Sequence, residues 1–157
     1  MNNDSSSKIS EKDKRILFLL NKYKARMHII NCIYQSELFN KNLSIQEILE
    51  NCGENQLNAN EIESLKIIEA KYDVFTRIAK KFISEDWEWN RILPLSRAII
   101  IYGEYELLFN DPKVVINEMV NISKIYSPNN DYKFINKVLD LVSKNVIKKN
   151  TKDEKEN

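Results

Sequence analysis

The sequence predicts an all-α protein, built as a compact bundle of six to seven helices. Its 157 residues include only two glycines and three prolines, whereas sheet proteins need turn residues at intervals of about 8–12 positions. Apolar side chains recur at steps of three and four along several long segments, which is the helical period. Two pairs, Asp111-Pro112 and Ser127-Pro128, place a capping side chain directly before a proline, a combination typical of helix starts.

The first helix is expected from about Lys14 to Phe39, with an interruption allowed near Asn21. Its apolar positions are Ile16, Leu19 and Leu20, followed by Ile29, Ile30, Ile33 and Tyr34. This spacing predicts that one side of the helix packs on the core. A second, short helix should begin at Ser44, whose hydroxyl can accept from the amide of Glu47, and should end near Gly53.

The longest amphipathic pattern predicts a helix from Asn60 to about Ser84, with Glu63 in the reciprocal capping position. Its apolar stripe comprises Ile62, Leu65, Ile68, Tyr72, Phe75, Ile78 and Phe82. These positions are three or four residues apart, so one face should be buried and the other should be charged. A charged connector with Trp87 and Trp89 follows, and we expect Trp87 to be a core or helix-packing position instead of a ligand contact.

Three further helices complete the predicted bundle. The segment from about Leu95 to Phe109 is apolar nearly all round, which predicts a central position. The helix that begins at Asp111-Pro112 presents an apolar stripe of Val115, Met119, Ile122 and Tyr126. The helix that begins at Ser127-Pro128 presents Phe134, Val138, Leu141 and Val146.

Length and composition indicate one domain. Residues 1–13 and 150–157 lack apolar periodicity, so we expect disordered tails around a single domain of residues 14–149. No apolar run approaches the roughly 18 residues that a membrane helix needs, and Cys32 and Cys52 have no metal-ligand spacing. These features favour the cytoplasm and exclude a membrane-spanning class.

The charge is unevenly distributed, although its total is only +1. Residues 1–26 carry seven basic against three acidic side chains, whereas residues 44–90 carry five against ten. Such segregation can create a face that binds a polyanion. An ordinary solvated helix surface is the alternative explanation.

Catalytic motifs are absent from the sequence. The one histidine, His28, lies in an apolar helical stretch, and two glycines cannot form a loop that wraps a phosphate. Glu104 and Glu106 are two residues apart, so on a helix they point in different directions and make a poor acid–base pair. We therefore expect no enzymatic activity, no metal and no cofactor.

The segment from Lys22 to Tyr34 mixes basic and aromatic residues. Lys22 and Arg26 are four positions apart, so on a helix they share a face and can contact successive phosphates. A nearby tyrosine can stack on an unpaired base. An ordinary amphipathic helix explains the same segment, and the rest of the chain must decide between the two.

From about residue 22 to residue 142 the chain resembles the NusB family. The most specific stretch begins with Trp87 and Arg91 and continues through Leu95-Ser-Arg-Ala-Ile-Ile-Ile-Tyr-Gly-Glu-Tyr-Glu-Leu-Leu. It then includes Asp111-Pro-Lys-Val-Val-Ile-Asn-Glu and Lys133-Phe-Ile-Asn-Lys-Val-Leu-Asp. The segment from Lys22 resembles the family's arginine-rich stretch, which runs into an Ala-Leu-Tyr element, here Cys32-Ile33-Tyr34.

The resemblance implies a compact NusB-like helical fold and a non-enzymatic transcription antitermination factor. It implies binding to boxA-like single-stranded RNA of ribosomal RNA leaders, a heterodimer with the small-subunit ribosomal protein NusE, and action with the RNA polymerase antitermination complex. A homodimer is a further option. The RNA-binding residues that it implies are Lys22, Lys24, Arg26, Tyr34, Asn130, Lys133 and Phe134, and Ser96 corresponds to a position of partner contact.

Two other interpretations fit parts of the pattern. A NusB-like fold can be the RNA-docking module of a ribosomal RNA methyltransferase, but that arrangement needs a long catalytic domain, which we do not expect here. A helical protein-interaction module with weak or lost RNA binding would suit the thinned arginine segment, in which Tyr23 stands between two lysines. Phe134 is equally suited to stack on a base and to anchor its helix in the core.

Overall fold

Six α-helices form the parts of the protein that the structure, a computed structural model, describes, which are residues 10–51 and 57–147. They are α1 (Glu11–Leu38), α2 (Ile45–Asn51), α3 (Ala59–Phe82), α4 (Pro94–Leu107), α5 (Pro112–Tyr126) and α6 (Asp131–Val142). A 3-10 turn (Trp89–Arg91) precedes α4, and a π-helical turn (Ser143–Ile147) follows α6. No strand occurs in these two ranges. The predicted all-α class and the number of helices are confirmed.

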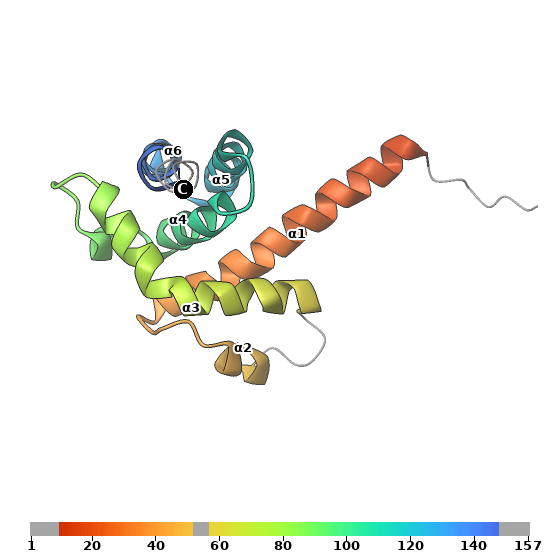
Figure 1. The fold of residues 1–157 in the computed structure, drawn as a ribbon, viewed down its shortest axis with the longest axis horizontal. Coiled ribbons are helices and arrows are strands. Elements are labelled where there is room, and N and C mark those ends of the chain that lie inside the picture. Colours follow the sequence, from red (N-terminus) through yellow and green to blue (C-terminus); the bar gives the residue numbers. More distant parts are fainter. Residues whose placement is uncertain (1–9, 52–56, 148–157) are drawn as a thin grey trace, which may run out of the picture.

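Helix α4 lies at the centre of the bundle, as its all-round apolar sequence predicted. It packs against α1, α3, α5 and α6, which surround it in Figure 1. Every residue from Ser96 to Glu104 is buried. Gly103 allows the closest approach, because a Cβ there would lie 2.8 Å from Cδ1 of Leu139 in α6 and 3.2 Å from Cγ of Met119 in α5. A Cβ at this position would therefore force the Leu139 side chain to move.

Buried polar contacts fix the C-terminal end of α1 against α4. Arg97 of α4 donates through Nε to Oε2 of Glu37 at 2.8 Å and through Nη1 to the carbonyl of Ile92 at 2.6 Å. Tyr72 of α3 donates to the other oxygen of Glu37 at 2.5 Å. Removing one member of such a buried pair leaves an uncompensated charge, so these contacts hold α1, α3 and α4 in one arrangement.

Two of the predicted helix starts are confirmed and one is displaced. Asp111 accepts from the amide of Lys113 at 2.8 Å, and Ser44 accepts from the amide of Glu47 at 3.3 Å. The N-cap residue of the long helix α3 lies two residues earlier than predicted, at Asn58 and not at Asn60. Its capping box is formed with Glu61 instead of Glu63.

The predicted start at Ser127-Pro128 is wrong. Ser127 ends α5, because its amide donates to the carbonyl of Ser123 at 2.8 Å. Asn129 then adopts a left-handed conformation with φ of 61°, and α6 begins only at Asp131, with Asn130 as its N-cap residue. The Ser-Pro pair therefore terminates one helix instead of starting the next.

Helix α1 runs from Glu11 to Leu38 without the interruption allowed near Asn21. Its N-terminal half projects past the other helices in Figure 1. The core prediction for this half is wrong, because no other described helix covers it. The side chains concerned are 46–56% exposed and are Ile16, Leu19 and Leu20.

Some predictions fall on residues outside the described ranges. These are Gly53, Cys52, residues 1–9 of the predicted N-terminal tail and the whole of the C-terminal tail at 150–157. Residues 11–13, also assigned to the tail, form the first turn of α1. None of the described helices combines the length and the apolar character needed to cross a membrane.

Candidate nucleic-acid interface

The residues predicted to bind RNA occupy two parts of the structure. On α1 they are Lys22, Lys24, Arg26 and Tyr34, and at the start of α6 they are Asn130, Lys133 and Phe134. The hydroxyls of Tyr23 and Tyr126 lie 2.9 Å apart, so α1 contacts the last residue of α5, four positions before Asn130. This hydrogen bond, followed by burial, raises the pKa of Tyr23 to about 12. This hydrogen-bonded tyrosine pair connects α1 to the corner between α5 and α6.

The two lysines of α1 point in different directions. Lys22 and Lys24 are two positions apart, which is about 200° around a helix. Both are exposed, so both can neutralise phosphates. Nζ of Lys22 lies 5.0 Å from the ring centre of Phe18, beside a groove of about 400 Å³ between α1, α4 and the start of α3. An RNA strand that contacts both Lys22 and Lys24 must therefore pass around α1.

Arg26 faces the interior and not the solvent. Its Nε donates to Oε1 of Glu106 at 2.8 Å, and its Nη1 lies 3.7 Å from Oε2 of Glu118. Only 13% of the Arg26 side chain is exposed. Burial acts to lower the pKa of Arg26, but the hydrogen bond to Glu106 and the charge of that carboxylate outweigh it, and the pKa is raised.

The geometry therefore corrects the expectation that Lys22 and Arg26 form one phosphate-binding face. Arg26 holds α1 against α4 and α5 through the carboxylates of Glu106 and Glu118. Tyr102 donates to the same Glu106 oxygen at 2.9 Å, and burial, then the charge of Glu106, raises the pKa of Tyr102. Direct RNA contact by Arg26 stays a prediction, and it would require the guanidinium to exchange a carboxylate for a phosphate.

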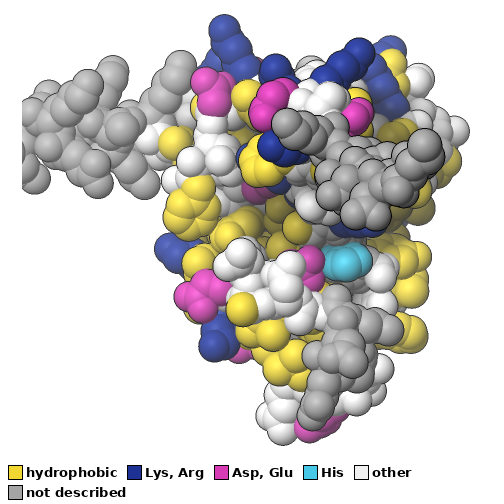
Figure 2. All heavy atoms as spheres, turned by 90° about the vertical axis from the view of Figure 1, so that its right-hand side faces the viewer, with side chains coloured by type: hydrophobic (Ala, Val, Ile, Leu, Met, Phe, Trp, Pro, Cys, Tyr) yellow, Lys and Arg dark blue, Asp and Glu magenta, His cyan; other side chains and the backbone are white. Residues whose placement is uncertain are grey.

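Aromatic rings line the groove beside Lys22. The ring centres of Tyr102 and Tyr105 are 5.8 Å apart, and those of Tyr105 and Phe109 are 5.4 Å apart. Figure 2 looks onto this side of the molecule, where hydrophobic side chains gather near the centre and the cyan His28 lies at their edge. Nδ1 of His28 is 3.1 Å from Oε1 of Glu61, so the histidine serves the capping network of α3. Sequence reasoning missed this groove, because rings on an apolar helix looked like core positions.

A second group of basic and aromatic residues lies beside the start of α6. Nζ of Lys124 and Nζ of Lys133 lie 5.0 and 6.0 Å, respectively, from the ring centre of Tyr132. Lys124 and Tyr132 were not among the predicted residues. Lys124 precedes Asn130 in the sequence and Tyr132 follows it. The proximity of Lys124 and Tyr132 could have been predicted if the end of α5 had been placed correctly at Tyr126.

The two aromatic residues predicted to stack on bases are both partly buried. Tyr34 packs against the hydrophobic core from α1. Phe134 also packs against the core, and its ring centre is 5.8 Å from that of Trp87, with the planes tilted by 30°. Trp87, expected to be a core or helix-packing position, packs on Phe134 but is 55% exposed and does not belong to the core, whereas Trp89 is only 7% exposed. The accessible ring at this site is therefore Trp87.

Ser96, the predicted partner contact, is completely buried. Its hydroxyl donates to Oδ2 of Asp131 at 2.7 Å and lies 3.5 Å from the hydroxyl of Ser127. These contacts join the start of α4 to the start of α6. A hydroxyl in this position cannot meet a partner directly, so any influence of Ser96 on an interface must act through Asp131.

The described residues contain no candidate metal site. Among them, no group of three or more histidine, cysteine, aspartate or glutamate side chains is placed to hold a metal ion. The arrangement consists of exposed lysines, rings and one helix start, which can bind an anionic, aromatic polymer.

Comparisons with known proteins identify the family to which the chain is similar. The model of the NusB family matches residues 23–144 of the chain. The transcription antitermination protein NusB of Sulfurimonas denitrificans is 33% identical over 130 residues, covering 78% of this chain and 96% of that protein. The protein of the same name from Clostridium perfringens strain SM101 is 32% identical over 136 residues, covering 81% and 99%.

A solved structure shows the same fold. The structure of T. maritima NusB superimposes with a TM-score of 0.66 at 25% sequence identity, covering 78% of this chain and 89% of that one. The similarity therefore extends over the helical body, and the part of α1 that precedes residue 23 lies outside the family match.

Proposed function

The chain belongs to the NusB family of transcription antitermination proteins, and from this premise we propose that it binds a boxA-like single strand of ribosomal RNA leaders together with the ribosomal protein NusE. In this role it would act in the cytoplasm, within the antitermination complex of RNA polymerase. Proteins of this family are non-enzymatic factors, which agrees with the absence of catalytic motifs from the sequence.

The observation that carries the RNA proposal is the contact between Tyr23 and Tyr126. It connects the basic segment of α1 to the corner where Lys124, Tyr132 and Lys133 are grouped. Exposed ammonium groups on both sides of this contact can neutralise the phosphates of one strand. Two tyrosines that bond to each other leave their ring faces for packing or stacking.

We assign the RNA contacts as follows. Lys22, Lys24 and Lys133 bind phosphates, Asn130 provides an amide at the start of α6, and the rings of Tyr34 and Phe134, the latter with Trp87, stack on unpaired bases. Arg26 acts as a positioning residue through Glu106.

A second candidate function is a helical interaction module that binds NusE with weak or lost RNA binding. It is favoured by the internal pairing of Arg26, which removes one cation from a segment that has few of them. The two candidates differ in one measurable property, namely the affinity of the chain for RNA with and without the partner.

The test uses the full chain and NusE, first in co-purification and then in fluorescence anisotropy with a boxA-like single strand. A strand of the same composition in scrambled order is the control. The proposal expects tighter binding of the boxA-like strand, and a further gain in affinity when NusE is present. Little or no binding of either strand, together with a stable NusE complex, would support the second candidate, and equal tight binding of both strands would contradict the boxA preference.

A further inference from the structure

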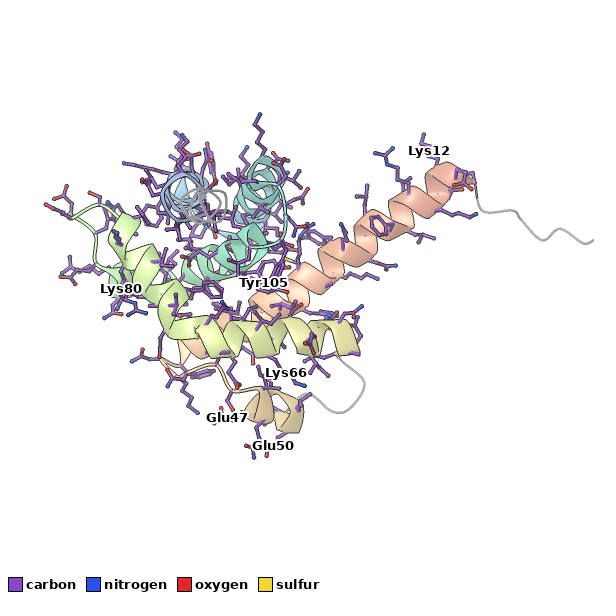
Figure 3. All side chains as sticks on the ribbon, viewed as in Figure 1. Lys12, Glu47, Glu50, Lys66, Lys80 and Tyr105 are labelled. Atoms are coloured by element: carbon purple, nitrogen blue, oxygen red, sulfur yellow. The ribbon has the colours of Figure 1, made fainter. Side chains whose placement is uncertain are left out.

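The N-terminal half of α1 presents an unusual surface. Five consecutive apolar residues, from Ile16 to Leu20, are 46–58% exposed. They lie on the part of α1 that extends away from the other helices in Figure 1, and Figure 3 shows Lys12 near its far end. An exposed apolar patch of this kind commonly marks an interaction site. The family match begins at residue 23, so the NusB-like body does not account for this segment.

One stripe of this helix has a special order of residues. Asp13, Leu17, Leu20 and Lys24 follow one another at steps of four, three and four, so they lie along one face. This face is opposite to the one that packs on the body, because Ile29 and Ile33 are buried on the other side of α1. All four stripe residues are exposed.

The stripe is complementary to a second copy of itself that runs in the opposite direction. About a point between Phe18 and Leu19, Asp13 is the counterpart of Lys24, and Leu17 is the counterpart of Leu20. We propose that two copies of the chain pair through this stripe as an antiparallel helix pair, with Asp13 of each copy facing Lys24 of the other and the leucines packed between them. A two-fold contact needs such a surface, in which residue i meets j and j meets i.

Charge favours this direction over the parallel one. A parallel pair would bring Asp13 against Asp13 and Lys24 against Lys24 of the two copies, which is repulsive. The antiparallel pair replaces both repulsions with attractions. Of the other apolar side chains in this half of α1, Ile16 lies beside the stripe, whereas Phe18 and Leu19 lie about 130° away around the helix, so the apolar contact depends mainly on the two leucines.

The contact is short, which sets its strength. A helix pair of about three turns falls in the low range of interface areas, below about 1,200 Å², where complexes are weak and transient. We expect a dimer that forms at high protein concentration and weakens in salt, because its charge pairs are exposed. The pairing requires neither RNA nor NusE, so it can be tested apart from the proposed function.

Sedimentation equilibrium of the full chain over a range of concentrations tests the pairing. Leu17→Glu should weaken the dimer about tenfold or more, since the symmetric contact loses the leucine twice. Leu49→Glu is the matched control, because Leu49 is a similarly exposed leucine on α2 (43% against 49%) and should leave the dimer unchanged. Circular dichroism of each variant checks that the helices are retained.

A charge exchange provides the decisive test of the register. Asp13→Lys and Lys24→Asp should each weaken the dimer about threefold to tenfold, as exposed ion pairs do when broken and reversed. The double variant, Asp13→Lys with Lys24→Asp, should restore the dimer. Each copy then carries the positive charge at position 13 and the negative charge at position 24, so the two positions attract each other again across the contact. A monomer at all concentrations, a dimer indifferent to Leu17→Glu, or a failure of the double variant to recover would overturn the proposal. So would a monomeric chain that uses Leu17 to bind NusE or lipid vesicles.

Discussion

Nε of Arg26 donates to Oε1 of Glu106 across 2.8 Å, in a site where the two side chains are only 13% and 8% exposed. The pair joins the basic segment of α1 to the central helix α4, and Tyr102 donates to the same oxygen. The arginine that the sequence marks as an RNA ligand is thus part of the protein interior. We therefore expect any effect of Arg26 on RNA binding to operate through the position of α1.

Replacing Arg26 should therefore damage the fold before it damages a contact with RNA. Arg26→Ala leaves the buried carboxylate of Glu106 without its cation, and we expect a loss of about 3–5 kcal/mol in unfolding free energy. Lys24→Ala, on the exposed face of the same helix, should change stability by no more than about 0.5 kcal/mol. Urea denaturation followed by circular dichroism measures both. Equal stabilities of the two variants would contradict the structural role of Arg26.

The salt dependence of RNA binding should identify the lysines that touch phosphate. Lys24→Ala and Lys133→Ala should each flatten the plot of log affinity against log salt by about 0.7, the value for one contact on a single strand. Lys66→Ala serves as the control, because Figure 3 shows Lys66 on α3, away from α5 and α6. Anisotropy titrations at four salt concentrations provide the slopes. A slope that is unchanged in both test variants would remove these lysines from the interface.

Trp87 and Trp89 form a matched pair for the aromatic contacts. Trp87 is 55% exposed and lies against Phe134, whereas Trp89 is 7% exposed. Trp87→Ala should weaken RNA binding by about 1–3 kcal/mol if its ring stacks on a base, with little change in melting temperature. Trp89→Ala should lower the folding stability by about 3–5 kcal/mol. Full RNA affinity in a well-folded Trp87→Ala protein would exclude stacking at this ring.

Local sequence signals predicted where the helices lie in the chain better than they predicted what packs against each helix. The all-round apolar segment of α4 and the cap at Asp111 depend on neighbouring residues only, and both were correct. Ser127 was misjudged because a Ser-Pro pair suits the end of one helix as well as the start of another, and the difference lies in the bond from its amide to Ser123. Periodicity likewise showed that Leu19 belongs to an apolar helix but not whether anything covers it.

The candidate site was harder to predict than the fold. The basic segment and the start of α6 were chosen by family resemblance, and the structure connects them through Tyr23 and Tyr126, a contact between residues 103 positions apart. Arg26 is neutralised by Glu106, 80 positions away. No spacing rule contains such a pairing, because it depends on how α1 crosses α4.

Glu104 should make the stability of the protein depend on pH. It is 2% exposed, and neither of its carboxyl oxygens has a hydrogen-bond partner among the described residues. Burial raises the pKa of Glu104 well above its ordinary value of 4.5, so the folded state holds the proton more tightly than the unfolded state. As the pH rises above that ordinary value, the unfolded chain ionises first, and stability falls until the folded carboxyl ionises as well.

Glu104→Leu should remove this pH dependence, because the leucine has no proton to lose. At pH 7 we expect it to raise the unfolding free energy by about 1–3 kcal/mol, the usual penalty of an unsatisfied buried polar group. Glu63→Leu, at an exposed position of α3, should leave the pH profile unchanged. Urea denaturation at several pH values from 4 to 8 measures the profile of each protein. A wild-type stability that increases steadily over this range would show that other carboxylates dominate, and a destabilised Glu104→Leu variant would show that the carboxyl has a partner in the folded protein.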